Sequence, residues 1–306
     1  MKHLKKALLL LPMALSGQAY ASCSNFHGQV ECFGSAAADT PGGTVTVTAL
    51  NDFSTAMAVA VEPSVDETTA TTATTGTSAT SAGVGVECSW FNGDNNNDTN
   101  VCTLPLSYSI HNEIDPRRQL VIKVPITRVE SKGVTPNTVY HVGLGASYTY
   151  PLATRWYVTP AINYTYAEEA NVFGTKPKAD LVSASIASAY YFKDQGLDIG
   201  IGNMFLASQS VNESGGQGST HINVLRNGLM VGWPGKAFGR KQYWEASLVD
   251  TLFFGTTTYT DHQLEIGLTV GDKRSYKATG GGYRLGLSVF DAGQATGAKI
   301  AFGYWF

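Results

Sequence analysis

The sequence predicts an all-β fold, a transmembrane antiparallel up-and-down β-barrel of about twelve strands with a short N-terminal extension. Three observations favour it: segments of about ten residues with alternating apolar and polar side chains, aromatic residues near the ends of these segments, and an export-like N-terminus. Only 15% of the residues are charged, and the chain contains 33 Gly and 15 Tyr. Such a composition is typical neither of a disordered chain nor of a helical membrane protein.

Residues 1–21 have the features of a secretory signal peptide. Lys2, Lys5 and Lys6 precede an apolar run over residues 7–15, and an A-x-A cleavage site occupies residues 19–21. Cys23 follows the predicted cut closely, so a lipoprotein is an alternative, although the residues around it fit a lipidation box poorly. After residue 21 the sequence contains no run of about 18 apolar residues, so it predicts no membrane-spanning helix.

Residues 22–82 form an extension with a different composition. Residues 44–50 predict a short strand, and residues 66–82 are a low-complexity tract of Thr, Ala and Ser. This composition is typical of a flexible periplasmic linker. The alternative is that part of the extension lies inside the barrel. In an exported chain the spacing of the four cysteines favours two local disulfides, Cys23–Cys32 and Cys88–Cys102.

The barrel itself is predicted over residues 83–306. The clearest strand is RWYVTPAINYTYAEE, 155–169, in which apolar and aromatic residues occupy one face and mostly polar or small residues the other. The same alternation gives twelve strands, with ten as the alternative: 83–91, 103–111, 118–129, 139–151, 155–168, 180–193, 196–207, 221–233, 243–254, 262–271, 282–290 and 297–306.

The connections between these strands fit a barrel whose two ends of chain are periplasmic. The breaks at 152–154 and 193–196 are short enough for periplasmic turns, and those at 169–179 and 208–220 suit external loops. The connection 272–281 is long for a periplasmic turn. Arg226 and Asp250 interrupt the alternation of their strands, which predicts bulges or errors of phase there.

The last segment, KIAFGYWF, has an apolar face that carries Phe302, Tyr304 and Phe306. Together with the signal peptide and the repeated alternating strands, it resembles bacterial outer-membrane β-barrel proteins. The resemblance implies a Gram-negative outer membrane as location, with lipid and lipopolysaccharide around the barrel. It also implies that Phe302, Tyr304 and Phe306 act as the recognition signal for the barrel-assembly machinery.

The polar face of the strands predicts the lining of the lumen. Many of its residues are small, which either widens a pore or leaves room for a plug. Charged side chains on this face would set the ion preference of a pore; the candidates are Lys123, Arg155, Glu265, Arg284 and Lys299. The alternative is that these charges neutralise one another in a wall network.

Two further candidate sites are weaker. Asp94, Asn96 and Asp98 have the alternating oxygen spacing of a calcium loop, but no Glu follows at the required distance, so a disulfide-tied external loop is favoured over a calcium site. The sequence thus predicts no cofactor, with calcium as the alternative. Ser219, His221 and Asn223 could share one face of a strand, yet no hydrolase motif surrounds them. We therefore predict no catalytic residues and no enzyme.

The predicted function is an outer-membrane pore or small-solute channel that works by passive diffusion through a polar lumen. The alternative is a barrel that serves secretion or adhesion, or that anchors a partner in a surface assembly. The formal net charge of −3 argues against a nucleic-acid partner.

Overall fold

The computed structural model describes residues 23–26, 29–32, 80–93, 98–112, 114–115, 117–132, 137–169, 178–214, 221–255, 261–272, 282–293 and 295–306. The chain divides into two compact units, Met1–Phe33 and Gly34–Phe306. The predicted signal peptide and the low-complexity tract up to residue 79 lie outside the described residues.

The first unit contains a small antiparallel hairpin of β1 (Cys23–Phe26) and β2 (Gln29–Cys32). Its backbone register places Cys23 directly opposite Cys32. The side chains of this hairpin are outside the described part of the chain, so the Cys23–Cys32 disulfide stays a prediction.

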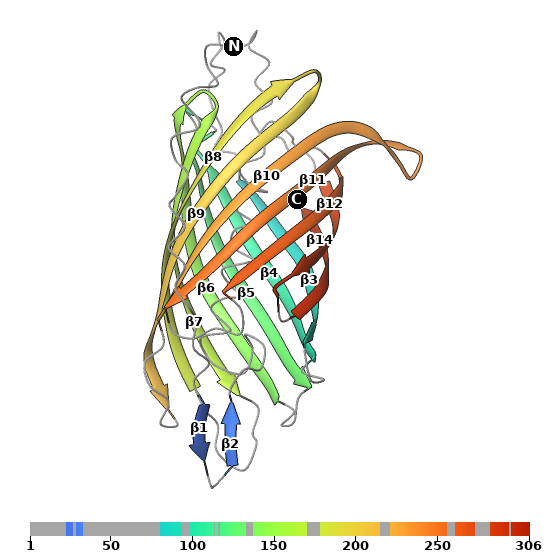
Figure 1. Ribbon diagram of the computed structural model, residues 1–306. Coiled ribbons are helices and arrows are strands. Elements are labelled where there is room, and N and C mark those ends of the chain that lie inside the picture. The colour runs from blue at the N-terminus through green and yellow to red at the C-terminus, as the bar shows by residue number, and fades with distance from the viewer. Residues whose placement is uncertain are drawn as a thin grey trace, which may run out of the picture. The chain divides into compact units, whose positions relative to one another are not determined.

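The second unit contains a closed barrel of twelve antiparallel strands (Figure 1). Each strand pairs with its neighbours in the chain, and β14 pairs with β3 to close the ring. The strands are β3 (Thr80–Gly93), β4 (Asp98–His111), β5 (Gln119–Lys132), β6 (Asn137–Ala153), β7 (Trp156–Glu169), β8 (Lys178–Asp194), β9 (Leu197–Ser214), β10 (His221–Ala237), β11 (Arg240–Gly255), β12 (His262–Gly271), β13 (Gly282–Asp291) and β14 (Ala295–Trp305).

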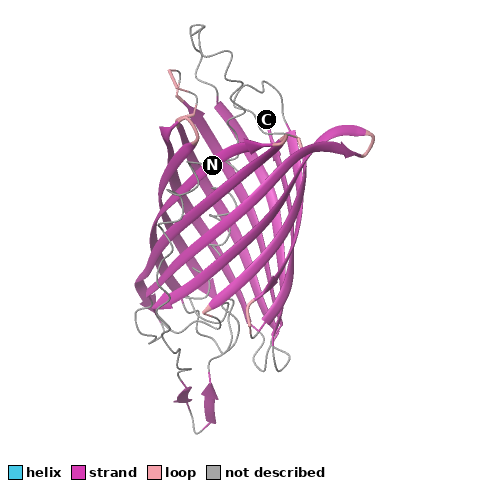
Figure 2. Ribbon diagram, turned by 45° about the horizontal axis from the view of Figure 1, so that its top comes forward, coloured by secondary structure: helices cyan, strands magenta, loops and turns pink. Residues whose placement is uncertain are grey.

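This architecture confirms the predicted fold class and the count of twelve strands rather than ten. The observed strands are mostly longer than predicted, and the barrel begins at Thr80 rather than residue 83. All regular structure in the described residues is strand (Figure 2). Within that same part of the chain, no helix is long and apolar enough to cross a membrane.

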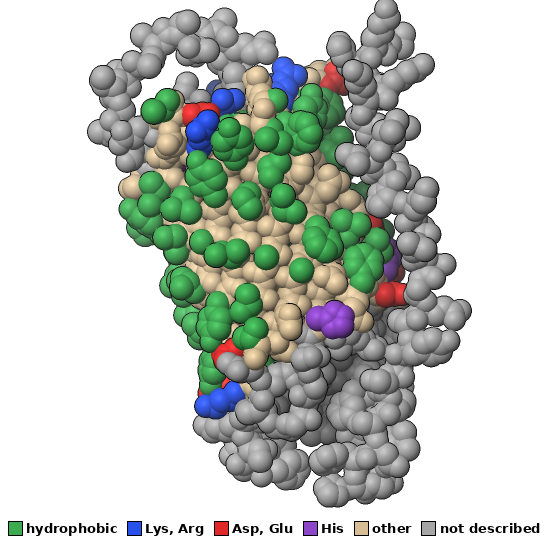
Figure 3. All heavy atoms as spheres, turned by 90° about the vertical axis from the view of Figure 1, so that its left-hand side faces the viewer, with side chains coloured by type: hydrophobic (Ala, Val, Ile, Leu, Met, Phe, Trp, Pro, Cys, Tyr) green, Lys and Arg blue, Asp and Glu red, His purple; other side chains and the backbone are tan. Residues whose placement is uncertain are grey.

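The strands alternate in burial because successive side chains point to opposite sides of the barrel wall. Along β14 the outward Ile300, Phe302 and Tyr304 are exposed, whereas the inward Lys299 and Ala301 are partly buried. On the face shown in Figure 3, hydrophobic side chains are spread over the wall among backbone and other side chains, and Lys and Arg lie toward its top and bottom. Exposed outward aromatic residues stand toward both ends of the strands, as in the girdles of transmembrane barrels: Trp90, Tyr108, Tyr140, Tyr148, Tyr150, Trp156, Tyr164, Tyr190, Phe254 and Tyr304.

The barrel has two distinct ends. We call the end where β3 begins and β14 finishes the terminal end; it also carries the connections 112–118, 154–155, 195–196, 238–239 and 272–281. The other is the loop end, with the connections 94–97, 133–136, 170–177, 215–220, 256–261 and 292–294. Two terminal-end turns, Gln195–Gly196 and Phe238–Gly239, have positive φ at both residues. This is the type I′ geometry that matches the twist of paired strands.

The hairpin of β10 and β11 extends past its neighbours at the terminal end (Figure 1). Pairing with β9 stops at Gly232 and pairing with β12 begins at Tyr243, whereas β10 and β11 continue to pair with one another up to Ala237 and Arg240.

The predicted irregularities at Arg226 and Asp250 are wrong. Both residues lie in uninterrupted ladders, and the register shifts of the barrel occur instead at 151–153 and 180–181. Arg226 breaks the pattern because it faces inward beside apolar neighbours, and Asp250 because it faces outward. The predicted loop 208–220 is also shorter than expected, since β9 continues to Ser214.

The Cys88–Cys102 disulfide predicted from the sequence is present. The two cysteines are directly opposed on β3 and β4, with a Cα–Cα distance of 4.2 Å. They belong to the outward face, where Trp90 and Leu104 follow them. The disulfide therefore ties two strands within the wall near the loop end.

Replacing both cysteines by Ser should lower the free energy of unfolding by about 3 kcal/mol, because the disulfide closes a short loop of the unfolded chain. The barrel should still fold, since its closed ladder is intact. Urea unfolding followed by Trp fluorescence measures the change. A double variant that fails to fold under conditions where the wild type folds would contradict this estimate.

Candidate functional site

The candidate site is the lumen, where small inward residues leave a cavity of about 410 Å³. Its lining includes residues at the terminal end, such as Ser81, Arg117 and Trp305. Small residues are needed here: a Cβ on Gly85 would lie 2.9 Å from the carbonyl oxygen of Phe302. The lining also contains Gly83, Ser107, Ser247, Gly267, Gly286, Ser288, Ala301 and Gly303, most of which the sequence placed on the inward face.

An ionic network centred on Glu265 forms one wall of this cavity. Glu265 of β12 accepts from Lys299 of β14 at 2.6 Å and pairs with Arg226 of β10 at 3.4 Å. Ser288 donates a further hydrogen bond to Glu265 at 2.7 Å, and Arg226 donates to Thr251 at 3.1 Å. Every carboxylate and guanidinium contact here is made between different strands. The network therefore cross-links the inner wall from β10 to β14.

A second ion pair joins Glu245 of β11 to Arg284 of β13, nearer the terminal end. Both side chains are less than one-tenth exposed. Glu87 of β3 interacts electrostatically with Lys299, Glu265 and Arg226. Three cations and three carboxylates thus face one another along this wall, which is the neutralised arrangement that the sequence left as an alternative.

The structure brings most of the predicted lumen residues together. Glu265 and Lys299 belong to the network, Arg284 pairs with Glu245 on the same wall, and Lys123 lines the cavity from β5. Arg155 does not line it; it lies in the exposed turn between β6 and β7. Its prediction failed because the strand begins one residue later, at Trp156.

Sequence reasoning missed Glu87, Arg226 and Glu245. Arg226 lies in phase with Ile222 and Val224, which are apolar and nevertheless face inward. Because the prediction assigns apolar faces to the outside of the barrel, it does not place Arg226 in the lumen. Glu245 alternates with outward Trp244 and could have been found from that phase.

Toward the loop end the inner wall contains two apolar clusters among buried polar side chains such as Thr99, His141 and Ser208. Inward side chains of β8–β11 pack in one cluster that is at most 8% exposed: Leu181, Met204, Leu206, Ile222, Val224, Val249 and Phe253. Val101 and Val129 form a second cluster on β4 and β5. We call these nine residues the apolar collar. The sequence predicted a polar lumen. The observed wall instead combines a polar and charged part with apolar clusters nearer the loop end.

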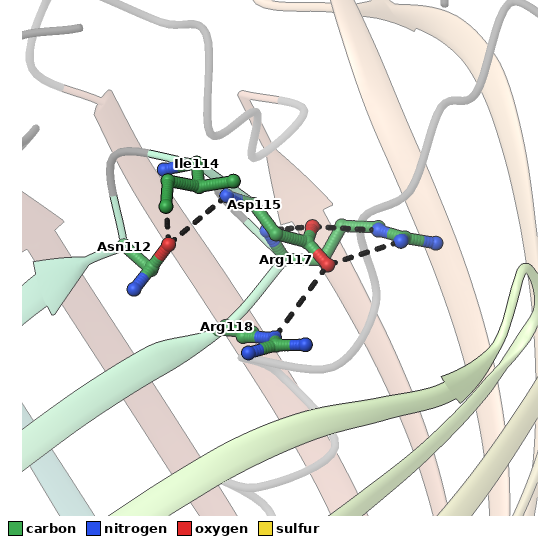
Figure 4. Close-up of polar contacts among 5 residues, drawn as sticks. All are labelled: Asn112, Ile114, Asp115, Arg117 and Arg118. Atoms are coloured by element: carbon green, nitrogen blue, oxygen red, sulfur yellow. Dashed lines mark hydrogen bonds and ion pairs between the residues drawn. The ribbon is translucent and has the colours of Figure 1, made fainter.

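The terminal-end turn between β4 and β5 is held by side chains (Figure 4). The side-chain oxygen of Asn112 accepts from the backbone NH groups of Ile114 and Asp115 at 2.9 and 3.0 Å. Asp115 accepts two hydrogen bonds from the Arg117 guanidinium at 2.8 and 3.0 Å. Burial opposes ionisation of Asp115, but the bonds and charges of Arg117 and Arg118 outweigh it and hold the pKa of Asp115 below its usual range. The turn thus fixes the position of Arg117 beside the cavity.

The remaining sequence candidates are partly outside the described residues. Asp94 and Asn96 fall there, so the calcium site stays a prediction; Asp98 begins β4 opposite Lys132. In the described part of the chain, no group of three or more His, Cys, Asp or Glu could hold a metal ion. Ser219 is also outside it, and His221 and Asn223 share the outward face of β10.

Phe302, Tyr304 and Phe306 lie on the outward face next to the closing seam and are each at least 44% exposed. Phe306 exchanges two backbone hydrogen bonds with Ala82, each 3.0 Å long. Their role in assembly stays a prediction.

Removing Phe306, or replacing it with Asp, should sharply reduce the yield of folded barrel while export across the inner membrane continues. The deletion removes an exposed aromatic side chain and both bonds to Ala82. The mobility of unheated against heated samples on a gel measures the folded fraction. An unchanged folded yield would show that Phe306 is not part of an assembly signal.

Comparisons with solved structures place this architecture among bacterial outer-membrane β-barrels. The β domain of the Bordetella autotransporter BrkA has a TM-score of 0.59 at 12% identity, covering 74% of this chain and 99% of that chain. The translocator domain of autotransporter NalP from Neisseria meningitidis has a TM-score of 0.59 at 11% identity, covering 86% and 97%. An outer membrane channel from Pseudomonas putida F1 has a TM-score of 0.51 at 13% identity, covering 74% and 94%.

No protein-family model matches the chain, and no curated protein matches it in sequence. The fold is that of bacterial outer-membrane β-barrel proteins, a class that includes both channels and autotransporter domains.

Proposed function

We propose that the protein is an outer-membrane pore that lets small polar solutes and ions diffuse through its lumen. The observation that carries this proposal is the cavity inside the barrel, which is lined by small and charged side chains and reaches the terminal end. The apolar outer wall with its aromatic girdles supports a position in the outer membrane, surrounded by lipid and lipopolysaccharide and inserted by the barrel-assembly machinery. In this topology the terminal end is periplasmic.

The charges of the lining support a weak preference for anions. Among the described residues, five cationic and three anionic side chains line the cavity. The cations are Arg117, Lys123, Arg226, Arg284 and Lys299, and the anions are Glu87, Glu245 and Glu265. Most of these charges are paired, so the net field is small. Lys123 stands on β5, six strands around the ring from β11, which carries Glu245.

Replacing Lys123 with Glu tests this preference without breaking either ion pair of the Glu265 network. The change removes one positive charge and adds one negative charge on the lining of the cavity, and screening extends about 8 Å at physiological salt. We expect the reversal potential in a salt gradient to shift toward cation preference. Arg128→Glu, on the outward face of the same strand, is the control and should leave it unchanged. Equal reversal potentials in all three proteins would contradict an ion path past Lys123.

The apolar collar favours a second candidate function. A pore for polar solutes does not require an apolar inner wall, whereas a polypeptide segment with apolar side chains would pack against it. The barrel would then serve secretion or adhesion, or anchor a surface assembly. Residues 33–79 precede Thr80 at the terminal end, where the cavity opens. If such a segment blocks the lumen, full-length protein should be silent in a bilayer and a chain without residues 22–79 should conduct.

A further inference from the structure

A row of polar side chains crosses the outward face of the barrel. Ser188, Asn203, Asn227 and Asp250 are directly opposed neighbours on the adjacent strands β8, β9, β10 and β11. All four alternate with inward residues and point away from the lumen. We call them the outer polar row.

Hydrogen bonds extend and connect this row. Asn203 donates to Asn227 at 3.1 Å, and the Trp156 indole NH donates to Ser188 at 2.8 Å. The His262 ring on β12 lies 2.6 Å from Asp250. The side chains of Asp250 and His262 are 39% and 51% exposed. Side-chain contacts therefore connect the row to Trp156 on β7 and to His262 on β12, while Val158 and Leu264 directly oppose its two ends.

Ser188 lies beside the girdle residue Trp156, whereas Asn227 and Asp250 lie inside the apolar band rather than at its rim. On β11, Asp250 stands between the outward Trp244 and Phe254, which mark the two aromatic girdles. The corresponding outward positions on the other side of the barrel are apolar, as at Leu106, Ile122 and Leu144. Such a carboxylate and two carboxamides would face hydrocarbon if lipid covered this surface.

Lipid tails offer no hydrogen-bond partner, so polar side chains within a membrane are costly and usually face protein or water. A carboxylate and an amide also have more hydrogen-bonding sites than the bonds above use. The row thus fits a protein surface inside the membrane.

We propose that the outward face of β9–β11 binds a second copy of this chain, with the outer polar row at the centre of the contact. The choice of partner rests on charge complementarity. The surface carries the hydrogen-bonded Asp250–His262 pair, with an acidic and a basic end, and amides that both donate and accept. Two copies related by a two-fold axis can place the acidic end of one pair against the basic end of the other. No Lys or Arg lies in the row to bind a lipid phosphate. Asn, Ser and His are also side chains that join membrane segments through hydrogen bonds.

The test compares two cysteine variants of the full-length protein in liposomes. Leu229→Cys lies outward on β10, two residues from Asn227, and leaves the row intact, and Leu144→Cys lies outward on β6, four strands away around the ring. After oxidation with copper phenanthroline, non-reducing gels should show at least about tenfold more covalent dimer for Leu229→Cys. The native cysteines are common to both variants. Equal yields at the two positions, or a covalent product with a different protein in whole membranes, would overturn the proposal.

The second measurement is the mass of wild-type protein in mild detergent. The wild type should be a dimer, and Asn227→Leu with Asp250→Leu should be a monomer whose heat-dependent gel mobility still reports a folded barrel. If the double variant does not fold, Asn227→Leu alone should weaken dimerisation by about tenfold. A wild type that is monomeric both in detergent and in liposomes would refute the interface.

Discussion

Replacing Glu265 with Gln should lower the free energy of unfolding by about 3 kcal/mol. Glu265 receives Lys299 at 2.6 Å, Arg226 at 3.4 Å and Ser288 at 2.7 Å. The Arg226 side chain is 1% exposed, so the variant would remove the carboxylate that pairs with a buried guanidinium and leave it the weaker electrostatic attraction of Glu87. Breaking a buried pair from one side costs far more than the pair contributes, because the remaining charge stays out of water.

The matched control is Glu130→Gln. Glu130 pairs with Arg128 on the outward face, and its side chain is 34% exposed. A partly exposed pair of this kind contributes about 0–1 kcal/mol. Urea unfolding of the refolded barrels, monitored by Trp fluorescence, compares the two. If Glu265→Gln and Glu130→Gln lower the free energy of unfolding equally, water rather than Glu265 solvates the charge of Arg226, and the prediction is wrong.

Replacing Val224 with Asp should destabilise the barrel by about 3 kcal/mol or reduce its folded yield correspondingly. Val224 is 0% exposed and packs among the inward residues of the apolar collar. A carboxylate there would lose its water, and Arg226, the inward cation two residues further on β10, is already held by Glu265 and Thr251. The reasoning requires that the packed neighbouring side chains shield Val224 from the water in the lumen.

Ser107→Asp is the control for Val224→Asp. Ser107 is also inward, but it lines the cavity and stands opposite Lys123. A carboxylate at this site should be tolerated. Equal folding of both Asp variants, measured by heat-dependent gel mobility, would show that water reaches the apolar collar. The lumen would then be polar along its whole length, as the sequence predicts.

The sequence predicts the barrel well because one physical rule governs most of its strands. Lipid demands apolar side chains outside, and the period of two then places every second residue. On β6 and β14 this rule locates each inward Gly, Ser and Lys. Cys88 and Cys102 could be paired from their spacing alone.

The rule fails where the inside is apolar too. On β10 the inward Ile222 and Val224 share a face with Arg226, so the single-strand pattern cannot tell which face points to the lumen. The pattern then predicts an irregularity at Arg226, although the ladders on both sides of β10 are regular there. The partners of Glu265 come from three other strands, and their meeting depends on the register between strands, which no local pattern contains. Asp250 reads as an error for the opposite reason: it faces outward in a place where lipid alone would disfavour it.

The neutral wall also changes how selectivity should be tested. Reversing Arg284 and Lys299 to Glu would place new carboxylates against Glu245 and Glu265. Such a variant would be destabilised by these like charges, so a change in its ion selectivity could not be assigned to the pore alone. Lys123 is the better probe because its wall lies away from the network.

The measurement that tests the central claim most directly is single-channel conductance of the purified full-length protein in a planar bilayer. We expect discrete steps with a weak preference for anions, from protein whose gel mobility shows a folded barrel. Folded protein that inserts yet gives no steps, both at full length and without residues 22–79, would contradict a pore and leave the secretion or anchoring function.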